Sequence, residues 1–113
     1  MQSFADNIVE LAVKALEIRG HGDITKVVED AEDAGLYDGI EVVKYDDNRV
    51  AVGGWIDFQF SEVRNVIVVD LYGPGHRGEP TLTETKDFGV GEPSFAVAWA
   101  MGKMLEAELI EEL

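Results

Sequence analysis

Cysteine is absent from the 113-residue sequence, which excludes disulfide frameworks and thiolate sites for metal or redox chemistry. Long apolar runs are absent too, and none approaches the roughly 20 residues that a membrane-spanning helix requires. The N-terminus lacks a basic region followed by an apolar one, as a signal peptide would have. These absences favour a cytoplasmic protein and predict no membrane partner.

Basic residues are scarce. The chain has 9 lysines and arginines against 23 aspartates and glutamates, and its formal net charge is -14. Affinity for nucleic acid comes mainly from lysine and arginine on phosphate, so direct binding of DNA or RNA is not expected. Anionic membrane surfaces are disfavoured for the same reason. Three interpretations of the acidity remain: a highly soluble surface, adaptation to a salty cytosol, or attraction to a partner with a basic surface.

Hydrophobic residues make up 46% of the chain, which is enough for one core and unlike a disordered acidic tail. We therefore expect a single acidic domain over residues 1–113. Its densest block of β-branched and aromatic residues runs over 49–72. The apolar residues in the first half of this block occupy alternate positions: Val50, Val52, Ile56, Phe58 and Phe60.

This alternation predicts a strand over 49–60 with one buried face. The strand is either bent at Gly53-Gly54 or folded there into a tight hairpin. Val66–Val69 does not alternate, which predicts an interior strand covered on both faces. Further strands are expected over 40–45 and, at an edge of the sheet, over 81–85.

Three segments show helical spacing of apolar residues. The first follows Ser3 as N-cap and ends at Gly20, and the second follows Asp23 and ends at Gly35. The third starts near Pro93 and reaches the C-terminus. The sequence therefore predicts an α+β fold, in which a three- or four-stranded, mostly antiparallel sheet carries two N-terminal helices and one C-terminal helix.

Groups suited to catalysis or metal binding are few. The two histidines, His21 and His76, lie far apart in sequence without a recognised ligand spacing, so no metal site is assigned. Asp57 and Asp70 interrupt apolar strands. They either form a carboxylate pair on one face, or each of them faces solvent or pairs with Arg49 or Arg64. We assign no catalytic residue and no cofactor, and we do not expect an enzyme.

Acidic residues crowd the ends of two predicted helices, where the helix dipole disfavours negative charge. Solubility alone does not require this placement, so at least one cluster is expected to face a basic partner. Trp55 is a candidate anchor for the same interface. The predicted partner-binding residues are Glu29, Asp30, Glu32, Asp33, Trp55, Glu106, Glu108, Glu111 and Glu112.

The segment Phe95–Met101 of the last predicted helix is apolar on every side, and Ala98 with Gly102 permits close backbone approach. This pattern predicts either a homo-oligomer formed through the C-terminal helix or tight docking of that helix.

Three functions are consistent with these patterns. The first is a small acidic protein-binding module that acts as an inhibitor or adaptor, including a nucleic-acid mimic such as a phage-type anti-defence protein. The second is a structural subunit of a larger assembly such as a virion. The third is a small ligand-binding protein or enzyme that uses the Gly73–Pro80 loop, whose glycines let backbone N–H groups approach an anion.

Overall fold

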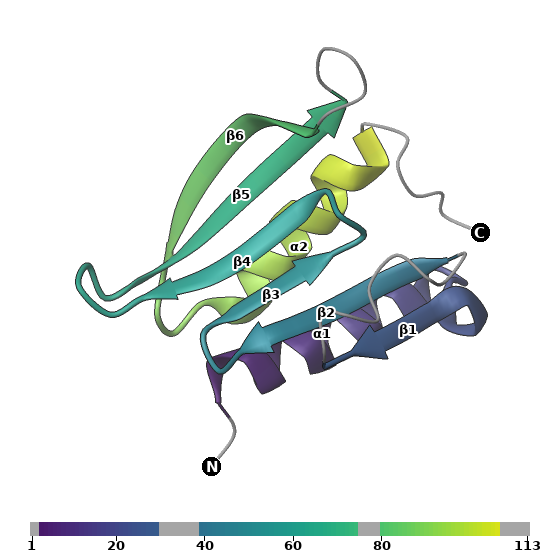
Figure 1. Ribbon diagram of the computed structural model, residues 1–113, viewed down its shortest axis with the longest axis horizontal. Coiled ribbons are helices and arrows are strands. Elements are labelled where there is room, and N and C mark those ends of the chain that lie inside the picture. Colours follow the sequence, from purple (N-terminus) through teal and green to yellow (C-terminus); the bar gives the residue numbers. More distant parts are fainter. Residues whose placement is uncertain (1–2, 30–38, 75–79, 107–113) are drawn as a thin grey trace.

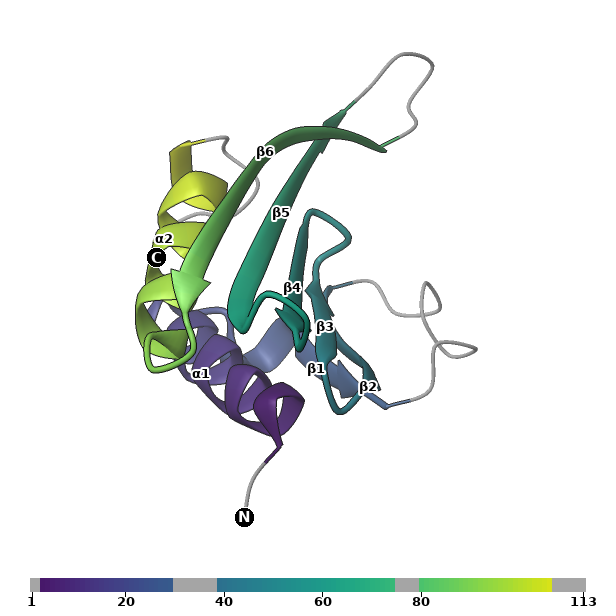
Figure 2. The same cartoon turned by 90° about the vertical axis from the view of Figure 1, so that its left-hand side faces the viewer.

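The computed structural model describes residues 3–29, 39–74 and 80–106. Within these ranges the fold is α+β: one N-terminal and one C-terminal helix pack on a six-stranded, mostly antiparallel open sheet (Figure 1). The strands follow the order β1-β2-β3-β4-β5-β6, so each strand pairs with its neighbours in sequence. Both helices lie on the same face of the sheet (Figure 2).

The helices are α1 (Phe4–Ile18) and α2 (Pro93–Glu106), with a short 3-10 turn, η1 (Gly22–Ile24), after α1. The strands are β1 (Thr25–Val28), β2 (Ile40–Asp46), β3 (Arg49–Val52), β4 (Ile56–Ser61), β5 (Val66–Pro74) and β6 (Pro80–Gly89). Among the described strands, β1 and β2 pair in parallel and the other neighbours are antiparallel.

The first helix begins and ends where the sequence predicts. The Ser3 side chain accepts a hydrogen bond from the Asp6 N–H at 3.1 Å, which satisfies one of the free amides of the first turn. Gly20 follows the helix with φ 88°, a conformation that favours glycine.

The prediction of a second N-terminal helix is wrong for its first half, because residues 25–28 form β1 instead. The β-branched residues of Thr25–Val28 suit an extended backbone, and β2 satisfies its hydrogen bonds. Pairing with β2 thus overrides the helical spacing of the apolar residues. The second half of the predicted helix lies outside the described residues.

The predicted strand over 49–60 is two strands, as the hairpin interpretation requires. Gly53 and Gly54 have φ of 62° and 74°, and the Trp55 N–H donates to the Val52 carbonyl at 3.1 Å. Two consecutive positive φ values are those of a type I′ turn, whose twist matches that of a hairpin. This extra turn, together with β1, raises the number of strands above the three or four expected.

The core lies between the helices and the sheet. The alternating residues of β3 and β4 meet Ile8, Leu16, Val97 and Met101 of the helices in one buried cluster. On the opposite face of the strands, here called the open face, neither of the two described helices lies over the sheet (Figure 2). The expectation that Val66–Val69 is covered on both faces is wrong, because Ile67 and Val69 are buried whereas Val66 and Val68 are only half-buried.

Candidate functional site

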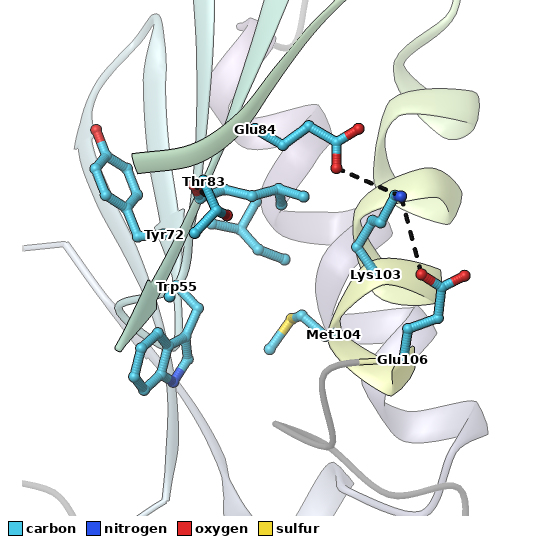
Figure 3. Close-up of a pocket in the computed structure, with 10 residues that line it drawn as sticks. Trp55, Tyr72, Thr83, Glu84, Lys103, Met104 and Glu106 are labelled. Carbon is cyan, nitrogen blue, oxygen red and sulfur yellow. Dashed lines mark hydrogen bonds and ion pairs between the residues drawn. The ribbon is translucent and has the colours of Figure 1, made fainter. Parts of the chain in front are cut away.

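A cavity of about 460 Å³ lies between the sheet and the C-terminal half of α2 (Figure 3). Strands β4, β5 and β6 supply one side of the cavity, and the last turns of α2 supply the other. Its lining is mainly apolar and aromatic, with a charged group at the helix. The lining residues are Trp55, Ile56, Leu71, Tyr72, Gly73, Thr83, Glu84, Lys103, Met104 and Glu106.

The turn before β4 fixes the position of Trp55. The residue directly follows the Gly53-Gly54 turn, and its carbonyl accepts a hydrogen bond from the Tyr72 N–H at 2.7 Å. The Gly53 N–H donates to the Glu41 carbonyl of β2 at 2.8 Å, which ties the turn to a third strand. The Trp55 ring is thereby held on a rigid part of the sheet, opposite Met104 of α2 (Figure 3).

A bulge in β6 shapes the wall of the cavity next to Tyr72. Leu71 pairs with Glu84 whereas Tyr72 pairs with Leu82, so Thr83 is an extra residue in β6. Its hydroxyl donates to the Leu71 carbonyl at 3.1 Å. Gly73 makes the close approach of the two strands possible, because a Cβ there would lie 3.1 Å from the Thr83 methyl group.

Three charged side chains border the cavity. Lys103 Nζ lies 3.4 Å from Glu84 Oε2 and 3.8 Å from Glu106 Oε2, so the ammonium stands between two carboxylates (Figure 3). The same ammonium lies 5.7 Å from the centre of the Trp99 ring. With two carboxylates and one ammonium the border is net negative, and the side chains of Glu84 and Glu106 are 47% and 75% exposed to solvent.

The structure brings together two of the predicted partner-binding residues, Trp55 and Glu106, in this cavity. A third, Glu29, is exposed after the end of β1 and lies away from the cavity, near Lys44. The other predicted residues lie outside the described residues: Asp30, Glu32, Asp33, Glu108, Glu111 and Glu112.

Sequence reasoning missed Thr83, Glu84, Lys103 and Met104 as part of one site. Met104 had the apolar spacing of a core residue, and it is indeed buried while its side chain also lines the cavity. Glu84 had no signal, because its position depends on the bulge in β6. Of these four residues, Lys103 alone could have been singled out from the sequence. It is a cation in a helix whose C-terminal end is otherwise rich in glutamate.

Asp57 and Asp70 lie directly opposite each other on β4 and β5, but each carboxylate has its own partner. Arg49 holds Asp57 through Nη2 at 2.7 Å and Nε at 3.0 Å, and this carboxylate raises the pKa of Arg49 further. Asp70 accepts a hydrogen bond from the Thr85 hydroxyl at 2.8 Å. Pairing with Arg49, one of the two interpretations of the sequence, is therefore correct for Asp57, whereas Arg64 binds Asp87 and not Asp70.

His21 is buried after the end of α1, where its N–H donates to the Leu16 carbonyl at 2.8 Å. Across residues 3–29, 39–74 and 80–106, no group of three or more His, Asp or Glu is placed to hold a metal ion. His76 and most of the Gly73–Pro80 loop lie outside the described residues.

Searches of protein-family models, curated proteins and solved structures give no match to this chain. Among the helices that the structure describes, none has the length and hydrophobicity needed to cross a membrane.

Proposed function

We propose that the chain is a small acidic module that binds a protein partner with a basic surface and acts as an inhibitor or adaptor. The observation that carries this proposal is the cavity between Trp55 and Met104, where an apolar lining meets an acidic border. Such a site suits a partner segment that carries a large apolar side chain next to lysine or arginine.

The apolar lining supports an anchoring role. Aromatic and methionine side chains are enriched at the centres of protein interfaces, and a few such residues carry most of the binding free energy. Met104 is unbranched and flexible, so it can adapt to the shape of the inserted side chain. Trp55 adds rigid surface on the sheet side.

The charges support the choice of a basic partner. A cation of the partner can approach Glu84 and Glu106 from solvent. The single positive charge of Lys103 lies between these two carboxylates, so one negative charge is left without compensation. The formal net charge of -14 acts in the same direction over longer distances and would steer a basic surface to the site. A mimic of nucleic acid is one form that such a module can take.

We propose a binding role and not a catalytic one, in the cytoplasm. The two carboxylates that the sequence offered for acid–base chemistry, Asp57 and Asp70, are each bound by another side chain on the open face. Neither of them lines the cavity.

A second candidate function, the binding of a small ligand, is favoured by the size of the cavity. Its volume of about 460 Å³ lies within the range that is common for ligand pockets. Gly73, the first residue of the Gly73–Pro80 loop, is part of the lining. A ligand with an aromatic ring and an amine, such as tryptamine, would then raise the melting temperature, and Trp55→Ala would abolish the shift.

Selection from a phage-displayed library of random peptides tests the proposed function. Wild-type protein is expected to enrich peptides in which a large apolar residue adjoins lysine or arginine, and Trp55→Ala and the exposed variant Glu106→Lys should lose this enrichment. Tyr45→Ala, which removes an exposed aromatic residue from the open face, is the matched control and should select the same peptides. Enrichment without that pattern, or its retention by Trp55→Ala, would contradict the proposal.

A further inference from the structure

The outer surface of the two helices, which faces away from the sheet, carries exposed apolar side chains. Phe95 is 63% exposed and Ile18 is 73% exposed, although both lie on helices whose other faces are buried in the core. Ala98, one turn after Phe95, is exposed as well. One apolar side of α2 is therefore exposed, and none of the described residues covers it.

A groove of about 210 Å³ lies beside Phe95, between α1 and α2. Leu11 and Ile18 line it from α1, and Val97, Ala98 and Met101 line it from α2. An apolar cavity of roughly 150 Å³ is enough to hold benzene. The groove therefore has room for one phenyl ring, and the surface carries both a protruding ring and a place for one.

We propose that a second copy of this chain binds to this surface, and that Phe95 of each copy enters the groove of the other. A two-fold axis exchanges identical surfaces, so such an interface needs a protruding group and its receptor side by side on one surface. Phe95 and the groove meet this requirement, since both lie on the outer side of α2. The small side chain of Ala98 leaves space for the two helices to approach.

The charges around the groove also favour an acidic occupant. The charged residues that line it are Lys14 and Arg19, both cations, in a chain where acidic residues outnumber basic ones 23 to 9. Arg19 Nε is buried without a hydrogen-bond partner among the described residues. A copy whose Phe95 occupies the groove brings Glu92, one turn earlier in the chain, toward these cations.

This association should respond to salt in the opposite sense to the binding of a basic partner. Two chains of formal net charge -14 repel each other over long distances, and added salt screens that repulsion. The dimer is therefore expected to strengthen with salt, while the apolar contact of Phe95 is maintained. Failure of one proposal leaves the other intact, because the groove and the cavity at Trp55 share no lining residue.

Sedimentation equilibrium over a range of protein and salt concentrations tests the proposal. The wild-type protein should form a dimer, and Phe95→Glu should weaken it by about tenfold or more, as expected for an interface anchor. Ala98→Glu, a second exposed position, should weaken it too. Val63→Glu is the matched control: Val63 is 97% exposed in the turn between β4 and β5, and its replacement should leave the dimer intact.

Circular dichroism at a dilution where the proteins are monomeric should be unchanged in all three variants, because each side chain is exposed. A wild-type protein that is monomeric at every concentration and salt level would overturn the proposal. A Phe95→Glu variant that dimerises as well as the wild type would overturn it as well.

Discussion

The two faces of the sheet differ both in how apolar their side chains are and in what lies over them. On the helix side, Val50, Phe58 and Val69 are fully buried. On the open face, their neighbours along the strands are Ala51, Asp57 and Val68, which are half-buried or buried although neither described helix covers that face. The comparison shows that the more apolar face of the strands is the one that the helices cover, as the alternation of apolar residues predicts.

The same comparison applies to ion pairs. On the helix side, Lys44 Nζ lies 2.7 Å from Asp6 Oδ1 and joins β2 to α1. On the open face, Arg49 and Asp57 join β3 to β4 through a two-pronged contact. The side chain of Asp57 is only 12% exposed, whereas that of Asp6 is 43% exposed, so we expect the open-face pair to contribute more to stability.

The largest difference in stability between the two faces is expected when a valine of β5 is replaced by aspartate. Val69→Asp places a charge without a partner in the buried cluster and should prevent folding. Val68→Asp, one residue earlier, points to the open face next to Gln59 and Asp87 and should still fold, with reduced stability. The solubility and thermal unfolding of the two variants check this order. A folded Val69→Asp or an unfolded Val68→Asp would contradict the assignment of faces.

A smaller effect is expected from breaking the open-face ion pair. Arg49→Met keeps an apolar stem but leaves the Asp57 carboxylate buried without its donors, which should cost about 1–3 kcal/mol. The double variant Arg49→Met/Asp57→Leu removes both charges and should recover much of that loss. Urea unfolding of the single and double variants measures both values. Equal stability of Arg49→Met and wild type would show that the pair contributes nothing.

The smallest effect is expected from the pair on the helix side, and it depends on pH. The hydrogen bond from Lys44 lowers the pKa of Asp6 below its ordinary value of 3.8. The resulting stabilisation is present above pH 3.8 and is lost as the pH falls through the lower folded-state pKa. Asp6→Asn should therefore be less stable than wild type at neutral pH, and the difference should shrink in acid. A constant difference across this window would contradict the explanation.

The sequence alone was enough to predict the α+β class, the first and last helices and the strands at residues 40–45 and 66–69. These predictions depend on local signals: caps at Ser3 and Gly20, a proline at the start of α2 and runs of β-branched residues. The sequence alone was not enough to predict β1, because the extended conformation of Thr25–Val28 depends on pairing with β2. The hairpin at Gly53-Gly54 was one of two interpretations, and only the dihedral angles decide between them.

The candidate site was predictable only in part, because it too depends on contacts between residues that are far apart in the sequence. Trp55 and Glu106 could be singled out as residue types that bind partners, but they are 51 positions apart in the sequence and meet only through the packing of α2 on the sheet. The bulge at Thr83 then brings Glu84 to the same cavity. Long-range packing and a one-residue shift in register are properties that the spacing of residues does not reveal.

The salt dependence of peptide binding tests the proposed site most directly. A peptide enriched on the wild-type protein would be titrated by calorimetry at low and high salt, in parallel with the variant Glu84→Gln/Glu106→Gln. Affinity of the wild type should fall as salt rises, and the variant should bind more weakly at low salt with a smaller salt dependence, because Lys103 then leaves the border positively charged. Glu62→Gln, an exposed acid in the turn between β4 and β5, should behave as wild type. Unchanged affinity and salt dependence in the double variant would contradict the assignment of this cavity as the binding site.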